Sequence, residues 1–416
     1  MDETPENANG DGTVGDPSDT QQEQDARWML RSLGVALQGV GLASPNPTVG
    51  CLIVRENRIV GRGFHQYAQR DHAEVVALKE AGEAARGATA YVTLEPCSHY
   101  GRTGPCARAL IEAGVARVVA ATGDPNPLVQ GRGLAMLREA GIYVSAGLMA
   151  SEARTLNDAF AHFIRHHMPL VSLKIAATLD GAIAPPPSGQ RERASFPITG
   201  PASRDRVQEL RHAHDALLTG IGTVLADDPL LTDRSQRTRR RPLLRVVLDS
   251  QLRLPLASRI LDGVQDDLLI VTRNEVTRSE DRARQQALTD RGARILQIDA
   301  QAEGGISLRA LLQYLGQQDI TSVLIEAGAR LNRSALAADV VDKLYLFQAP
   351  RFLGPGAVPM LAGAHAASLP RLFRYQTERV EEDTLIEGYI HDPWELPFNS
   401  ETASQAGSSD LKASTL

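Results

Sequence analysis

The sequence predicts two consecutive α/β domains, and three observations lead to this prediction. The chain has 416 residues, which is long enough for two cores because single domains mostly run about 100 to 200 residues. Short runs rich in β-branched residues alternate with helical patterns, the order that places helices over a largely parallel sheet. The alternation restarts after Met168-Pro169. We therefore expect one domain over residues 25–167 and a second over 168–398.

The periodicity of the first domain predicts its elements in order. Strands are expected over residues 49–55, 89–94 and 117–122, and helices over 26–39, 72–81, 106–113, a stretch ending at Gly141, and 151–167. Cys51 lies inside the first of these strands, and as a small free thiol it is expected to be a buried core residue.

The second domain repeats the alternation with apolar strands. These are expected over residues 170–177, 216–220, 244–249, 268–272, 322–326, 343–348 and 385–390, with helical stretches between several of them. Residues 399–416 are rich in Ser, Ala, Gly and Thr and are expected to form a loose tail.

Composition excludes several classes of protein. The first 24 residues hold seven acidic groups and no Lys or Arg, and we expect them to form a disordered tail. Without them the net charge of −6 becomes +1, so neither a nucleic-acid nor an acidic-partner signal follows. No apolar run approaches the roughly 20 residues of a membrane span. Three cysteines are too few for a disulfide framework. The chain is expected to be cytoplasmic and to bind neither nucleic acid nor membrane, and a homo-oligomer is left open.

One imidazole, two thiols and a carboxyl group form the sharpest pattern. His72-Ala73-Glu74 is followed by Pro96-Cys97 and then by Cys106. Three ligands, His72, Cys97 and Cys106, would leave one zinc position open for water, as in catalytic rather than structural zinc sites. Glu74 is then free to carry the proton from that water to a ring nitrogen and a departing amine. The pattern predicts zinc-dependent deamination.

These residues resemble the cytidine deaminase superfamily, although eight residues rather than two separate the cysteines. That insert, residues 98–105, together with the runs over 45–50 and 124–127, resembles the deaminase half of the bifunctional riboflavin-biosynthesis deaminase/reductase. The resemblance implies a three-layer deaminase fold. It also implies a substrate site made of Asn46, His99, Arg102, Asp124 and Asn126.

Residue chemistry supports these roles without deciding them. Arg102 suits a 5-phosphate, and Asn46 and Asn126 can read ring amides. Alternatively, Arg102 is a solvated loop charge and Asn46 a turn former between prolines.

The second domain carries a lysine, Lys174, in an otherwise apolar run, and such a lysine needs an anionic or polar partner. The runs over 219–229 and 325–331 each pass from a strand through glycine toward a helix, a junction that suits an anionic ligand. Neither has the spacing of a dinucleotide fingerprint.

The same runs resemble the reductase half of that bifunctional enzyme, which implies a dihydrofolate-reductase-like α/β domain that uses NADPH. Lys174 and Glu326 would be its polarising and protonating groups. Carried over position by position, the cofactor residues would be Ala176, Pro197, Thr223, Asp227, Ser250, Gly328, Ala329, Arg330, Leu331, Asn332, Arg333 and Ser334. The substrate residues would be Ser195, Arg211, Leu231, Arg234 and Glu326.

The implied reaction is deamination of 2,5-diamino-6-(5-phosphoribosylamino)pyrimidin-4(3H)-one, followed by hydride delivery that opens the ribosyl group to a ribityl chain. Two departures bear on the second step: Pro197 stands where the family has tryptophan, and Ala182 where it has arginine. Loss of the aromatic ring could weaken stacking on the cofactor. The arginine run at 237, 239, 240 and 241 is expected to be a solvated loop.

Three other functions would leave different signatures in the protein. A nucleic-acid deaminase would show a basic surface and the shorter cysteine spacing. A deaminase with a decayed second half, acting as a ligand-binding module, would fail to bind NADPH. A non-catalytic zinc-stabilised protein would be indifferent to the change Glu74→Gln.

Overall fold

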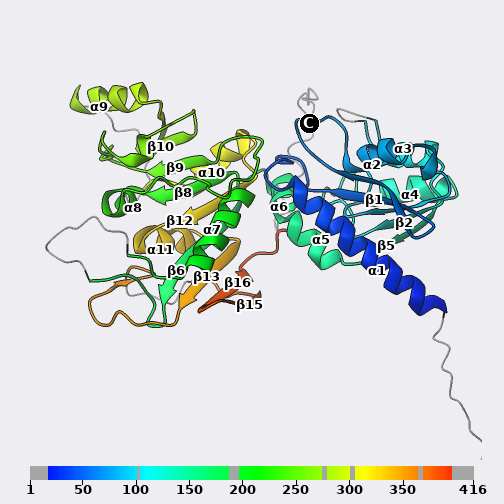
Figure 1. Ribbon diagram of the computed structural model, residues 1–416. Helices are drawn as coiled ribbons and strands as arrows, with labels where there is room; N and C mark the ends of the chain where they lie inside the picture. Colours follow the sequence, from blue (N-terminus) through cyan, green and yellow to red (C-terminus); the bar gives the residue numbers. More distant parts are fainter. Residues whose placement is uncertain are drawn as a thin grey trace, which may run out of the picture.

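A computed structural model of the protein describes residues 17–100, 104–186, 196–273, 279–299, 305–363 and 369–395. It contains two α/β domains side by side (Figure 1), the first around a five-stranded sheet and the second around a nine-stranded sheet. A two-stranded ribbon, β7 (Ala182–Ala184) with β14 (Val358–Pro359), adjoins the second domain. Within these ranges no helix is both long and apolar enough to cross a membrane.

The first sheet has the order β2-β1-β3-β4-β5. Its strands are β1 (Gly50–Arg55), β2 (Arg58–Phe64), β3 (Thr89–Val92), β4 (Arg117–Ala120) and β5 (Tyr143–Ala146). Strand β1 pairs antiparallel with both β2 and β3, whereas β3, β4 and β5 run parallel. Cys51 is fully buried in the core of this domain, as expected.

The sequence did not predict β2 or β5. Strand β2 is obscured by Gly61 and Gly63, which are needed because helix α2 (Ala73–Ala81) packs directly against the strand. A Cβ at Gly61 would lie 2.1 Å from the Ala77 carbonyl oxygen, and one at Gly63 would lie 2.2 Å from that of Ala73. Glycine inside a strand often marks such a close backbone approach.

Helices cover both faces of the first sheet. They are α1 (Pro17–Ala36), α2, α3 (Cys106–Glu112), α4 (Arg132–Glu139), α5 (Ala150–Leu156) and α6 (Asp158–His166), with short 3-10 turns at Leu37–Gly39 and Gly82–Ala85. The expected tail is wrong for residues 17–24, which belong to α1. Glutamine and glutamate favour helix, and Gln21 Nε2 donates to Asp25 Oδ1 at 3.0 Å. Asp25 is in turn held by Arg117 and by the Tyr91 hydroxyl.

The single helix expected over 151–167 is two helices, because Asn157 interrupts it. This buried side chain bonds the backbone of Thr48 twice, accepting from its N–H at 2.8 Å and donating to its carbonyl at 3.1 Å. It also donates to the Ala153 carbonyl oxygen at 3.2 Å. Asparagine competes with regular helix in this way through local side-chain bonds.

The second sheet has the order β11-β10-β9-β8-β12-β6-β13-β16-β15. Its strands are β6 (Leu170–Thr178), β8 (Ala216–Gly220), β9 (Leu244–Leu248), β10 (Leu268–Arg273), β11 (Arg294–Ile298), β12 (Ser322–Glu326), β13 (Lys343–Ala349), β15 (Arg374–Val380) and β16 (Asp383–Tyr389). Pairing is parallel from β11 to β13 and antiparallel at β16 and β15. The unpredicted β11 and β15 are edge strands, and β15 is almost wholly exposed, so it lacks the apolar alternation that marks a strand.

In the described part of the second domain, the helices that pack on the sheet are α7 (Pro201–Ala213), α8 (Ile221–Asp227), α9 (Ser279–Asp290), α10 (Leu308–Gln317) and α11 (Ala329–Ala337), with a 3-10 turn at Arg259–Leu261. Separate apolar clusters on its two faces form the core of this domain.

The chain returns from the second domain to the first at its C-terminal end. The buried Asp158 carboxylate, at the start of α6, accepts from the Tyr389 hydroxyl at 2.5 Å and from the Trp394 indole N–H at 3.0 Å. The Trp394 ring packs on the core of the first domain, with the guanidinium groups of Arg154 and Arg165 5.2 and 5.8 Å from its centroid. Side chains of the second domain therefore complete part of the first.

Candidate active sites

The predicted zinc ligands lie together in the first domain. His72 is the N-cap of α2, Cys106 is the first residue of α3, and Cys97 lies in the loop between β3 and α3. His72 Nδ1 is 3.2 Å from Cys106 Sγ and 3.6 Å from Cys97 Sγ. The three donor atoms lie within 4.8 Å of one another, a spacing that one tetrahedral metal ion can bridge.

The chemistry of these donors suits zinc. Hydrogen bonds with Cys106 and His72 together lower the pKa of the Cys97 thiol to about 4, against the opposing effect of burial. The hydrogen bond with Cys97 and burial raise the pKa of the Cys106 thiol well above its usual value. The pair therefore favours loss of a proton from Cys97, and a divalent cation would bind both sulfur atoms as thiolates. The residues present therefore fit a Cys₂His zinc centre whose remaining side is open.

The open side is a cavity of about 230 Å³. The buried Glu74 lies on its wall, and burial, together with the nearby Cys97 charge, raises the pKa of this carboxyl group to about 7. Four predicted substrate residues line the same cavity, namely Asn46, His99, Asp124 and Asn126. The fifth, Arg102, lies outside the described residues.

Two further residues of this site were not predicted. His65 lines the cavity; its Nε2 lies 3.0 Å from Asn46 Nδ2, and its Nδ1 lies 3.2 Å from the Asp71 carbonyl oxygen. The buried Glu95 carboxylate accepts from the N–H groups of Asp124, Gly131 and Gly133. It therefore holds the Asp124 loop at the start of α4, where the helix dipole favours negative charge. The only sequence signal for Glu95 is its place directly before Pro96-Cys97.

In the second domain, Lys174, Arg211 and Glu326 meet. Lys174 on β6 and Glu326 on β12 are cross-strand partners, and their Nζ and Oε2 atoms lie 3.5 Å apart. Arg211, near the end of α7, donates from Nε and Nη2 to the two Glu326 oxygens at 2.6 and 3.0 Å. Lys174 thus has the anionic partner that its apolar surroundings require. Burial alone would raise the pKa of Glu326, but Arg211 and Lys174 lower it to about 2.

Most of the expected cofactor residues gather at the carboxyl edge of the parallel strands. Thr223 and Asp227 lie on α8 after β8, Ser250 follows β9, and residues 328–334 begin α11 after β12. A Cβ at Gly328 would lie 4.0 Å from Thr223 Oγ1, so the starts of α8 and α11 adjoin. Ala176 lies on the neighbouring β6. Ligands of open α/β sheets bind at this edge.

The remaining residues expected in the cofactor and substrate sites differ in burial and in their contacts. Asn332 is fully buried, and its Nδ2 donates to the Met360 carbonyl oxygen at 3.0 Å. Pro197 is exposed, and its carbonyl accepts from Arg351. Leu231 is buried, and the Arg234 N–H donates to Gln208 on α7. Ser195 lies outside the described residues.

The arginine run is not the solvated loop that we expected. Arg239 donates to the backbone carbonyls of Arg211, His212 and His214. Arg241 pairs with Asp215 at 3.2 Å, and the Arg240 guanidinium lies over the Tyr67 ring of the first domain. Arg237 alone remains mostly exposed. Composition cannot reveal these partners, which are distant in sequence.

Comparison with known proteins agrees with this two-site arrangement. Residues 22–122 match the model "Cytidine and deoxycytidylate deaminase zinc-binding region", and residues 169–386 match "RibD C-terminal domain". The chain is 45% identical to riboflavin biosynthesis protein RibD of Escherichia coli over 346 residues, 80% of this chain and 90% of that protein. It is 40% identical to RibD of Aquifex aeolicus over 335 residues, 80% of this chain and 89% of that protein.

Solved structures of similar proteins show the same fold. Acinetobacter baumannii RibD (form 1) superposes with a TM-score of 0.74 at 39% identity, covering 88% of this chain and 99% of that one. A deaminase/reductase from Thermotoga maritima gives 0.74 at 32% identity, covering 89% and 99%.

Fold and sites therefore define a bifunctional enzyme, a deaminase joined to a reductase. The chain belongs to the RibD family of riboflavin biosynthesis proteins. Because both halves match the family, the bifunctional interpretation holds over the alternative of a deaminase with a decayed second half.

Proposed function

We propose that the chain deaminates 2,5-diamino-6-(5-phosphoribosylamino)pyrimidin-4(3H)-one with Zn²⁺ and then reduces its ribosyl group with NADPH. The observation that carries the proposal is the cavity that brings Glu74 and the Cys₂His cluster together with Asn46, Asp124 and Asn126. The Thermotoga maritima relative is described as a diaminohydroxyphosphoribosylaminopyrimidine deaminase and 5-amino-6-(5-phosphoribosylamino)uracil reductase, which supports the substrate.

In the first reaction, His72, Cys97 and Cys106 would hold zinc, which supplies a bound water that ionises near neutral pH. Glu74 would accept a proton from the attacking water and pass protons to the ring nitrogen and the departing amine. A carboxyl group with a pKa of about 7 suits this exchange, because a catalytic group works best when its pKa is near the working pH. The Asn46 and Asn126 amides face the same cavity and would read the ring.

In the second reaction, NADPH supplies the hydride. A carboxyl group with a pKa of about 2 holds no proton near neutral pH, so we assign the proton-bearing role to Lys174 and the orienting role to Glu326. Arg211 fixes that carboxylate through two hydrogen bonds, which keeps the Lys174 ammonium group at the edge of the proposed cofactor site.

The test incubates zinc-loaded protein with the diaminopyrimidinone phosphate, with and without NADPH, and follows ammonia release and NADPH absorbance. Ammonia release in both mixtures, with NADPH oxidation in the second, is the expected result. Ammonia without NADPH oxidation would contradict the reductase assignment and would implicate Pro197 and Ala182. No ammonia would contradict the whole proposal.

We also propose a cytoplasmic location, which the free thiols of Cys97 and Cys106 support, because thiols stay reduced in the cytosol.

A further inference from the structure

We propose that His212, Asp215 and Arg240 of the second domain position the substrate-binding loop of the first domain. The loop comprises residues 40–47 and is called the Asn46 loop here. Its residues Pro45, Asn46 and Pro47 line the deaminase cavity. The proposal rests on the deaminase activity proposed above and makes the second domain a working part of that site.

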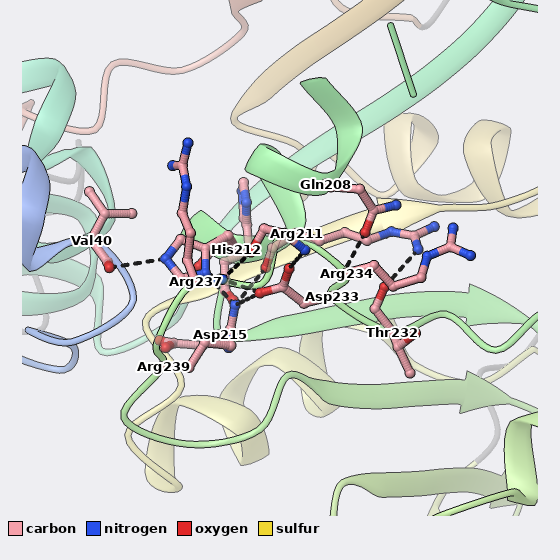
Figure 2. Close-up of polar contacts among 12 residues, drawn as sticks. Val40, Gln208, Arg211, His212, Asp215, Thr232, Asp233, Arg234, Arg237 and Arg239 are labelled. Atoms are coloured by element: carbon pink, nitrogen blue, oxygen red, sulfur yellow. Dashed lines mark hydrogen bonds and ion pairs between the residues drawn. The ribbon is translucent and has the colours of Figure 1, made fainter. Parts of the chain in front are cut away.

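Hydrogen bonds cross from the second domain to three residues of the Asn46 loop, namely Val40, Gly41 and Ser44. His212 Nε2 lies 3.2 Å from the Val40 carbonyl oxygen, a contact visible in Figure 2. The backbone N–H of Arg240 donates to the Gly41 carbonyl oxygen at 2.9 Å. The Ser44 hydroxyl donates to Asp215 Oδ2 at 2.7 Å. The loop is therefore bound at three of the six positions that precede Asn46.

Arg240 also contacts the wall of the cavity itself. Its guanidinium carbon lies 4.2 Å from the centroid of the Tyr67 ring, and Tyr67 lines the cavity. The Tyr67 N–H donates to the Leu42 carbonyl oxygen at 3.0 Å, so Tyr67 and the Asn46 loop are bonded to each other. Arg240 thus holds both through its backbone and its side chain.

The supporting groups are themselves fixed. Asp215 is buried and accepts from the Thr321 N–H and hydroxyl, each at 2.8 Å. Arg239 donates to the His212 carbonyl oxygen at 2.8 Å and to Asp233 Oδ2 at 3.1 Å, which fixes the end of α7 (Figure 2). A support that is rigid can set the position of a loop, because the loop cannot move without breaking these bonds.

The approach of the two domains here is close enough to demand glycine. Gly41 has φ +77°, and a Cβ on it would lie 2.8 Å from Cε1 of the His212 ring. Side chains rarely adopt this conformation, so the residue permits both the turn and the contact. The loop and the second domain thus fit each other directly.

The geometry makes these residues positioning residues, because none of them lines the deaminase cavity. Asn46 is placed by the loop, and misplacement of a substrate-holding group weakens binding more than it slows the proton transfers of Glu74. We therefore expect the loss of a support to raise KM for the pyrimidine and leave kcat almost unchanged.

The test compares full-length, zinc-loaded Arg240→Ala and Ser44→Ala with the wild type. Each should raise KM for ammonia release about three- to tenfold and leave kcat within about twofold. The matched control is Arg237→Ala, in the same arginine run but mostly exposed and paired with Glu209, and it should leave both values unchanged. Arg240→Lys keeps a cation over Tyr67 and should recover part of the lost affinity.

Zinc content and the kinetics of NADPH oxidation with the deaminated substrate serve as folding controls in every variant. Wild-type KM in both Arg240→Ala and Ser44→Ala would overturn the proposal while leaving the deaminase assignment intact. So would a fall in kcat, zinc content and reductase activity together, since that pattern indicates a structural role. Absence of ammonia from the wild type itself would instead overturn the proposed function.

Discussion

Glu74 combines burial, a raised pKa and a place beside two thiols at the end of one cavity. We expect Glu74→Gln to lower the rate of ammonia release by about a hundredfold or more, because an amide cannot shuttle protons. Zinc content and NADPH oxidation with the deaminated substrate should remain. Ammonia release, metal analysis and NADPH absorbance measure the three outcomes.

The control for this change is Glu80→Gln on the same helix, since Glu80 is half exposed and pairs with the exposed Arg62. Near-normal ammonia release by Glu74→Gln would show that another group carries the proton.

Glu326 makes the reductase centre sensitive to acid. Its folded pKa of about 2 lies below its ordinary value of 4.5, so it stabilises the folded state fully above about pH 4.5 and loses this effect as the pH falls toward 2. Near pH 7, Glu326→Gln should lower the free energy of unfolding by about 3 kcal/mol, because Arg211 and Lys174 lose their counter-charge in a buried site.

Denaturant titrations of both proteins at several pH values measure this difference. The gap between wild type and Glu326→Gln should narrow between pH 4.5 and 2. A gap that is constant with pH would mean that the ion pairs do not stabilise the fold.

At the scale of elements, Asn157 sets the boundary between α5 and α6 and ties α6 to the residue after Pro47. Asn157→Ala would remove three hydrogen bonds, one of them buried and two partly buried. We expect a loss of about 2 to 4 kcal/mol in unfolding free energy, since partly buried backbone groups of Thr48 and the Ala153 carbonyl would lose their partner. Thermal unfolding by circular dichroism, compared with the exposed variant Thr155→Ala, tests this. An equal melting temperature for both variants would contradict it.

Helices and strands were predictable from the sequence where their buried apolar residues recur with a regular period. Strand β12 was predicted at its observed bounds because it is a continuous apolar run buried on both faces. Helices α2 and α3 were predicted within a residue or two because their buried apolar residues face one core. Strand β2 was hidden by the glycines that admit α2, and β15 by its exposure. The Asn157 break could not be predicted, because its partner Thr48 is far away in sequence.

The three zinc ligands and Glu74 were predictable because they lie in short motifs with fixed chemistry. His65 and Glu95 were not, since each acts through a partner, Asn46 or the Asp124 loop, that only the fold brings near. The prediction of a solvated loop was wrong for Arg239 to Arg241 for the same reason. Their charge indicates exposure to solvent, whereas Arg239 donates to backbone carbonyls at the end of α7.

On the scale of the whole molecule, the two chemistries use separate groups although the domains share an interface. Dialysis against a zinc chelator should abolish ammonia release, because the cluster of His72, Cys97 and Cys106 lies only in the first domain. NADPH oxidation with the deaminated substrate should persist, and added Zn²⁺ should restore ammonia release. Equal loss of both activities would show that the metal also supports the reductase domain.

Trp394 of the second domain packs on the core of the first domain, and this contact affects folding during synthesis. During synthesis the deaminase domain leaves the ribosome first, yet the indole that packs on its core and bonds Asp158 belongs to a much later stretch of chain. Part of the deaminase core therefore stays exposed to solvent until nearly all of the reductase domain has been translated. During that interval, a chaperone that binds exposed apolar surface would have access to this patch.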